Sequence, residues 1–188
     1  AAGELRRIDR GLYDRPRKIS LTGQPTVPDY RAVIRAVTRR DQARAVVDGM
    51  TAANDLGLTT AVPARIEVLV DARLKPIKLG KQEIHFKFAA PSRLYWADRP
   101  AMRVVQALSW FRDDRASLDA AVNGIVRRLA SARERDAIVE DLHQNIQAVP
   151  AWMYPVIEKI TRTLPTDEGS DDASQLSDTT GAHAEGIR

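Results

Sequence analysis

The sequence predicts an α+β protein with a basic β-hairpin at the front, a small, mostly antiparallel sheet in the middle and a C-terminal group of helices. Three patterns support this prediction. A glycine-containing turn lies between apolar residues in 4–18, apolar and polar residues alternate in 64–73 and 83–89, and apolar residues recur at helical spacing after Pro91. The length of 188 residues is sufficient for one or two domains with a buried core.

Residues 4–18 are predicted to form a short hairpin with a strongly basic surface. Gly11 can supply the positive φ that a tight turn after Asp9 requires. The stretch contains three acidic residues and six basic ones, which are Arg6, Arg7, Arg10, Arg15, Arg17 and Lys18. Guanidinium groups on an exposed hairpin favour phosphate binding, so we expect these five arginines to contact a DNA backbone, with Gly11 setting the turn. The alternative is a solvated edge hairpin whose charges only prevent aggregation.

The hairpin is expected to be one part of a larger DNA-binding domain. A two-stranded ribbon is marginally stable on its own, and residue 1 of the chain is not Met. A hairpin with arginine at its tip resembles the wing of a winged helix-turn-helix, which packs on preceding helices. Residues 1–18 are therefore interpreted as the remnant wing of an N-terminally truncated domain. Residues 19–28, which contain two prolines, are predicted to be a linker.

A helix is predicted to begin at Asp29 and to run to about Asp48, with Gly49 just beyond its end, since apolar residues follow a near-helical period there. A break of this helix near Arg40 and Asp41 is the alternative. Thr51 is expected to cap a short helix that ends at Gly57. The alternating residues 64–73 and 83–89, with a short strand at 77–79, predict the antiparallel sheet.

Four helices are predicted after Pro91. Their apolar stripes lie within residues 102–111, 118–129, 138–146 and 153–164, and Ser131 with Glu134 forms a candidate capping box for the third. Pro155 is compatible only with the first turn of the last helix. Residues 29–165 are thus expected to form one α/β domain.

Charge is unevenly distributed along the chain. The net charge is +4, but residues 166–188 hold six acids and one base, so the rest of the chain carries +9. That last segment has almost no apolar residues and is predicted to be a disordered acidic tail. The basic body favours polyanionic partners.

A second basic feature is the helical spacing of Arg31, Arg35 and Arg39, which places all three on one helix face. We expect this face to contact either DNA or a protein partner. An ordinary solvated face is the alternative interpretation.

No catalytic, metal or cofactor site is predicted. The chain has no Cys, its three His residues are far apart in sequence, and it contains no phosphate-binding glycine loop. We therefore expect a non-enzymatic protein without a cofactor. The absence of Cys and of a long apolar run is in keeping with a cytoplasmic protein that does not contact a membrane.

Several stretches resemble the AbiEi family, the antitoxins of abortive-infection type E toxin–antitoxin systems of type IV. The stretch GELRRIDRGLYDRP at residues 3–16 is similar to the family's wing. The stretch AANDLGLTTAVPA at residues 52–64 is similar to its most distinctive internal segment, and a weaker similarity extends from Leu142 to Trp152. Altogether the resemblance covers roughly residues 3–160.

The resemblance implies a winged-helix DNA-binding domain followed by an antitoxin domain. It implies a bacterial, cytoplasmic antitoxin that represses its own operon and counteracts a nucleotidyltransferase-like toxin, either directly or only functionally. Operator DNA would then be bound by the full-length protein, and Asn54, Thr59 and Thr60 become candidate functional residues. These three also suit a helix end and a strand start. The rival interpretations are a basic protein–protein adaptor without DNA binding and, third, an enzyme whose site is hidden in the sequence.

Overall fold

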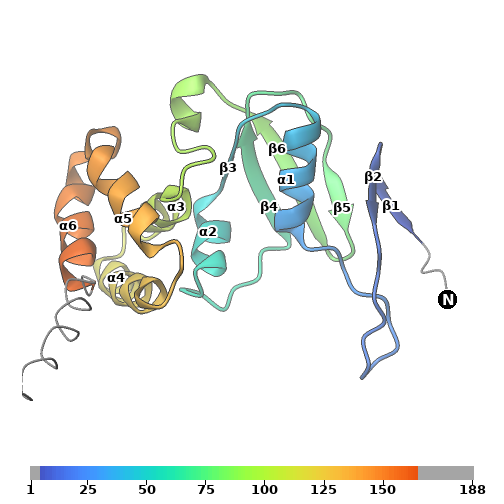
Figure 1. The fold of residues 1–188 in the computed structure, drawn as a ribbon, viewed down its shortest axis with the longest axis horizontal. Helices are drawn as coiled ribbons and strands as arrows, with labels where there is room; N and C mark the ends of the chain where they lie inside the picture. The colour runs from blue at the N-terminus through green and yellow to red at the C-terminus, as the bar shows by residue number, and fades with distance from the viewer. Residues whose placement is uncertain (1–4, 165–188) are drawn as a thin grey trace, which may run out of the picture.

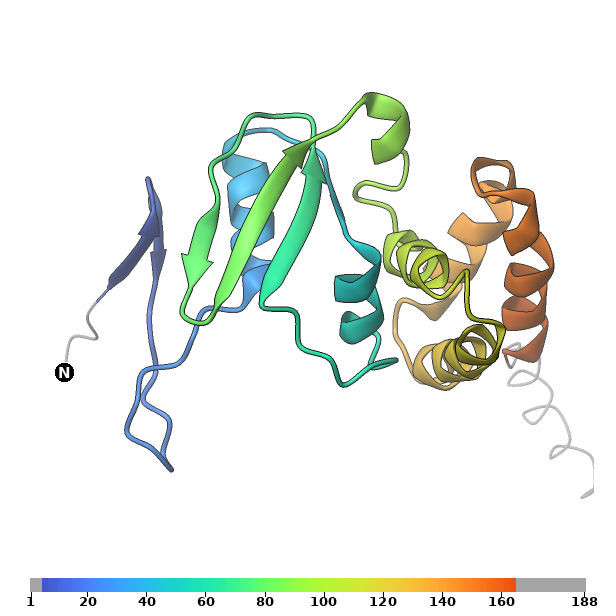
Figure 2. The same cartoon turned by 180° about the vertical axis from the view of Figure 1, so that it is seen from behind.

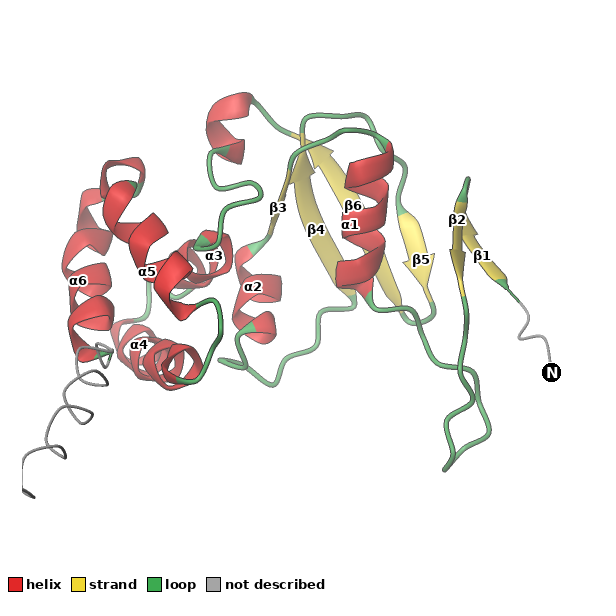
Figure 3. Cartoon of the chain, viewed as in Figure 1, coloured by secondary structure: helices red, strands yellow, loops and turns green. Residues whose placement is uncertain are grey.

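The computed structural model describes residues 5–164, and the expected acidic tail at 166–188 lies outside them. The described chain is α+β: the strands lie in two small sheets toward the N-terminal end, and helices α3 to α6 gather at the opposite end (Figures 1 and 3). The hairpin of β1 and β2 forms the outer edge of the molecule. Helix α1 lies across one face of the larger sheet, and in the view from behind the strands are in front of it (Figure 2).

The predicted hairpin is present as a separate two-stranded sheet. Strand β1 (Arg6–Asp9) pairs antiparallel with β2 (Leu12–Asp14), and Gly11 at the turn has a φ of 68°. Ile8 and Leu12 pack against the core, so one face of the hairpin is turned inward. Residues 19–28 contain no helix and lead into α1, with a single β-bridge between Lys18 and Pro25.

The helix predicted to run from Asp29 to about Asp48 ends at the alternative break near Arg40, so its second half is not helical. Helix α1 (Tyr30–Arg40) begins at the N-cap Asp29, whose side chain accepts from the Arg31 N–H, but it ends at Arg40. The chain then forms strand β3 (Ala45–Val47). Val46 and Val47 are both buried, and β-branched side chains buried on two faces favour a strand, although their spacing also fits a helix.

The larger sheet is mostly antiparallel, as predicted, but its central pair is parallel. The strand order is β3-β4-β6-β5, and β4 (Arg65–Val70) runs parallel to β6 (Gln82–Phe88). The outer pairs are antiparallel: β3 with β4, and β5 (Ile77–Leu79) with β6. The chain places β5 at the sheet edge and returns to insert β6 next to β4. Alternation of apolar residues fixes which face is buried and carries no information on strand direction.

Helix α2 (Gly49–Asp55) starts earlier than predicted. Its N-cap is Asp48, which accepts from the Thr51 N–H at 3.0 Å and from the Glu67 N–H of β4 at 3.1 Å. Thr51 is therefore not the cap, and Gly49 opens this helix and does not follow the preceding one. A Cβ on Gly49 would lie 2.7 Å from the Gln106 carbonyl oxygen, so glycine here permits the close packing of α2 on α3.

The C-terminal helices confirm the predicted number and order. They are α3 (Met102–Trp110), α4 (Arg115–Ala130), α5 (Arg135–Gln144) and α6 (Tyr154–Thr163), with short 3₁₀ turns at Pro91–Leu94, Ile146–Ala148 and Ala151–Met153. The capping box is wrong, because Glu134 is itself the N-cap of α5 and its side chain makes no capping hydrogen bond. Within residues 5–164, none of the helices has the length and apolar character needed to cross a bilayer.

Candidate functional site

The turn of the hairpin is attached to the C-terminal end of α1. The Arg40 guanidinium pairs with the Asp9 carboxylate at 3.1 Å and also donates to the Arg10 carbonyl oxygen. A hydrogen bond from the Arg10 backbone, followed by the hydrogen bond and charge of the Arg40 side chain, lowers the pKa of Asp9 below its ordinary value. The hairpin is therefore held in one place by an apolar inner face and by a charged contact at its tip.

Arg6 differs from the other arginines of the hairpin. Its guanidinium pairs with Asp14 on the opposite strand and donates to the Thr26 carbonyl oxygen at 2.8 Å. It thereby joins β1, β2 and the following loop. These contacts occupy the side chain that was expected to bind a DNA backbone, so we assign Arg6 to positioning the hairpin.

The remaining hairpin arginines face outward. Arg7, Arg10, Arg15 and Arg17 are all exposed, and none of them forms an ion pair with another residue in the described part of the chain. The only hydrogen bond from any of these guanidinium groups within that part is a long one from Arg7 to the Asp9 carbonyl oxygen, at 3.4 Å. Four arginines without an ion pair among the described residues thus lie at one end of the molecule.

The arginine stripe on α1 is divided between two environments. Arg31 pairs with Asp55 at 2.7 Å, whereas Arg35 and Arg39 are exposed and their side chains have no hydrogen-bonding or ionic partner among residues 5–164. The helical spacing correctly places the three on one side of α1. It does not reveal that the first of them is neutralised.

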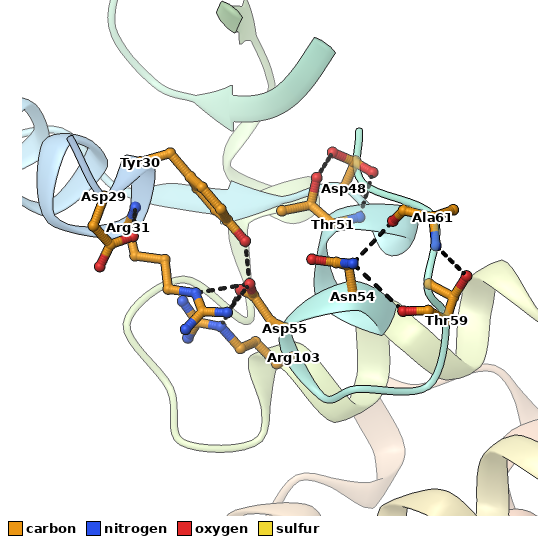
Figure 4. Close-up of polar contacts among 10 residues, drawn as sticks. All are labelled: Asp29, Tyr30, Arg31, Asp48, Thr51, Asn54, Asp55, Thr59, Ala61 and Arg103. Atoms are coloured by element: carbon orange, nitrogen blue, oxygen red, sulfur yellow. Dashed lines mark hydrogen bonds and ion pairs between the residues drawn. The ribbon is translucent and has the colours of Figure 1, made fainter. Parts of the chain in front are cut away.

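The Asp55 carboxylate joins three helices (Figure 4). It lies at the end of α2 and is only 2% exposed, and it binds Arg31 of α1 at 2.7 Å and Arg103 of α3 at 2.8 Å. The Tyr30 hydroxyl donates a further hydrogen bond to it. Because a buried carboxylate is costly without partners, these contacts fix the relative positions of α1, α2 and α3. We name Tyr30, Arg31, Asp55 and Arg103 the Asp55 cluster.

Asn54, Thr59 and Thr60 lie in and after the end of α2. The Asn54 side-chain amide donates to the Ala61 carbonyl oxygen at 2.9 Å, and the Thr59 hydroxyl accepts from the Ala61 N–H at 3.1 Å (Figure 4). These bonds shape the loop between α2 and β4. Thr60 is exposed. The contacts that the structure gives Asn54 and Thr59 are thus local and structural.

Sequence reasoning missed the acidic partners that organise the helices. Asp55 meets Arg103 across 48 residues of sequence, and the buried Asp141 pairs with Arg99 at 2.9 Å and accepts from the Ala101 N–H. No local spacing signals such distant pairs. Among the described residues, no group of three His, Asp or Glu side chains is placed to hold a metal ion.

The comparison with known families matches residues 1–136, which run from the hairpin through α4, to the model of one family. The chain belongs to the DUF6088 family. This family is described as one of unknown function. No curated protein and no solved structure matches the chain. The matched part of this DUF6088 protein includes the exposed hairpin arginines, α1 and the Asp55 cluster.

In the Asp55 cluster, we expect loss of the two arginines to destabilise the protein more than loss of the Asp55 charge. Replacing both Arg31 and Arg103 by Ala leaves a carboxylate that is 2% exposed without its cations, and we expect a loss of about 3–5 kcal/mol in the free energy of unfolding. Asp55→Asn should cost only about 1–2 kcal/mol, because the two arginines are 41% and 38% exposed and water can solvate them. Urea denaturation measures both, with Arg162→Ala, in an exposed pair, as the control. Equal losses would contradict the buried role of Asp55.

Tyr30 gives a prediction for alkaline pH. Burial, followed by its hydrogen bond to Asp55, raises the pKa of Tyr30 to about 12 from an ordinary value of 10.0. The folded state therefore favours the neutral phenol, and this contribution to stability is complete below about pH 10 and is lost as the pH rises through about 12.

Phenolate absorbance, recorded just after rapid mixing into alkaline buffer and before unfolding, measures this ionisation. Tyr30→Phe should remove a transition near pH 12. Asp55→Asn should shift that transition toward lower pH without abolishing it. A Tyr30→Phe protein that keeps the full late transition would show that another tyrosine produces it.

Proposed function

We propose that the protein is a DNA-binding antitoxin, which represses its own operon and opposes a nucleotidyltransferase-like toxin. The observation that carries the proposal is the hairpin, a separate β-ribbon at the edge of the molecule with four exposed arginines that form no ion pair within residues 5–164. Such a ribbon suits contacts with the phosphates of a duplex, because its guanidinium groups are accessible on an open surface. The AbiEi resemblance supports the antitoxin part of the proposal.

One face of the hairpin packs on the core of the molecule, and the other face is exposed. Ile8 and Leu12 face the core, whereas Leu5 and Tyr13 are 66% and 57% exposed on the other side. In the winged-helix interpretation, helices of the DNA-binding domain would cover this apolar outer pair. Arg7 is the register partner of Tyr13 and lies beside them.

Sequence recognition is a separate matter from the phosphate contacts. Arginines that bind phosphate fix the position of a protein on a duplex and carry no sequence information directly. In this proposal a recognition helix of the full-length protein reads the operator, and the hairpin sets its register. Arg39 on α1 is a second candidate for phosphate contact, because it is exposed and unpaired among residues 5–164.

The adaptor function is the second candidate, and one observation favours it. The loop after the hairpin exposes Ile19, Leu21 and Val27, and Leu21 is 95% exposed. Exposed apolar side chains next to basic ones suit a protein partner as well as a nucleic acid. DNA binding by the full-length protein distinguishes the two functions.

Replacing Arg7, Arg10, Arg15 and Arg17 together by Ala tests the DNA-binding role. We expect the full-length variant to bind its promoter duplex more weakly, with the slope of log affinity against log salt reduced by about 0.9 for each phosphate contact that is lost. The matched control replaces four exposed arginines outside the hairpin, Arg93, Arg112, Arg115 and Arg133, and removes the same charge. Titrations at several salt concentrations measure both. If the two variants lose affinity equally, the hairpin has no special role.

Co-expression tests the antitoxin role. The parent protein should restore growth to cells that express the nucleotidyltransferase-like protein encoded beside it. The hairpin variant should also restore growth while failing to repress a reporter from the same promoter, because the hairpin serves DNA in this proposal. Colony counts and reporter activity are the measurements. If the parent protein does not restore growth, the antitoxin role is wrong. The DNA-binding role would still be tested by the duplex titrations.

A further inference from the structure

We propose that the cavity between α1, α3, α4 and the start of α5 binds a nucleotide. The cavity has a volume of about 560 Å³, within the range of about 300–1,000 Å³ in which proteins hold small organic ligands. Its walls come from both halves of the molecule, namely α1 and α2 on the sheet side and α3 to α5 on the helical side. The site is distinct from the hairpin, and the inference does not depend on DNA binding.

Two of the arginines in the cavity wall are free to bind an anion. Arg35 lies on α1 and Arg128 on α4, and neither guanidinium has a hydrogen-bonding or ionic partner among residues 5–164. Three further arginines line the cavity but are already neutralised: Arg31 and Arg103 by Asp55, and Arg99 by Asp141. The paired cations keep the wall polar and rigid, and the unpaired ones remain available for a phosphate group.

An apolar wall lies in the same cavity. Ile34, Met102, Leu129 and Ile138 all line it, and each is less than a tenth exposed, so this wall is well packed and preformed. A purely inorganic anion would gain nothing from such a surface. A ligand that carries a flat, weakly polar ring beside its charged group would cover this wall and displace water from it.

Two carboxylates in the cavity wall indicate that the ligand also carries hydrogen-bond donors. Asp98 and Glu134 line the cavity, and their side chains form no ion pair or hydrogen bond within the described chain. Ionised carboxylates only accept hydrogen bonds, so they favour a ligand with hydroxyl or amino donors. A nucleotide combines the three features that these walls require: a phosphate for Arg35 and Arg128, a ring for the apolar wall, and ribose hydroxyls or base amino groups for the carboxylates.

Calorimetric titration of the full chain with AMP, GMP, CMP and UMP tests the proposal, with inorganic phosphate and citrate as the competing anions. We expect saturable binding of at least one nucleotide at one site per chain. Arg35→Ala combined with Arg128→Ala should weaken it about tenfold or more, because each change removes a charge-assisted hydrogen bond. The matched control is Arg39→Ala with Arg127→Ala, which removes equal charge from exposed sites on the same two helices outside the cavity.

The control variant should bind the nucleotide within about twofold of the parent, because long-range charge effects are small at physiological salt. Equal weakening in the two variants would overturn the proposal, since it would indicate general electrostatic attraction. The proposal also fails if no nucleotide binds up to millimolar concentration, or if phosphate or citrate binds as tightly as the best nucleotide. The hairpin variant should retain nucleotide binding, so the two proposals fail independently.

Discussion

The ion pairs of Asp55 are the contacts on which the arrangement of the helices depends. A carboxylate that is 2% exposed is retained because cations from α1 and α3 meet it from two sides. These pairs hold the sheet half of the molecule, represented by α1, against the helical half, represented by α3. Gly49 adds a steric condition, since only a residue without a Cβ lets α2 approach α3 so closely. Because α1, α2 and α3 also line the cavity, the Asp55 ion pairs and the close packing at Gly49 determine where its walls lie.

Helix α1 links the two candidate sites because its ends make different contacts. Arg31 near its start belongs to the Asp55 cluster, and Arg40 at its end binds the hairpin turn. Between them, Arg35 lines the cavity. A change in the tilt of this one helix would therefore move the hairpin turn and one wall of the cavity together. The hairpin turn and one wall of the cavity thus depend on the position of the same helix.

Sequence patterns predicted the elements better than their connections. The hairpin, the four C-terminal helices and the end of α2 shortly before Gly57 followed from periodicity and turn chemistry, because these are local properties. Val46 and Val47 were misassigned, since their spacing fits a helix and only their pairing with β4, more than twenty residues away, makes them a strand. The parallel alignment of β4 with β6 is likewise set by where the chain places β5. Pairing between strands that are distant in the chain leaves no recognisable pattern in a short stretch of sequence.

The same limit applies to the candidate sites, where counting charges overstates the number of free cations. Arg6 and Arg7 are adjacent in sequence, yet strand alternation turns Arg6 inward to Asp14 and leaves Arg7 exposed. Arg31 and Arg35 are one helical turn apart, yet only Arg31 meets a buried acid. Partner acids supplied by distant segments decide which arginines are neutralised. Two groups of arginines without an ion-pair partner among residues 5–164 carry the proposals, one on the open ribbon and one in the cavity wall, and their separate locations are the physical reason to propose different ligands for them.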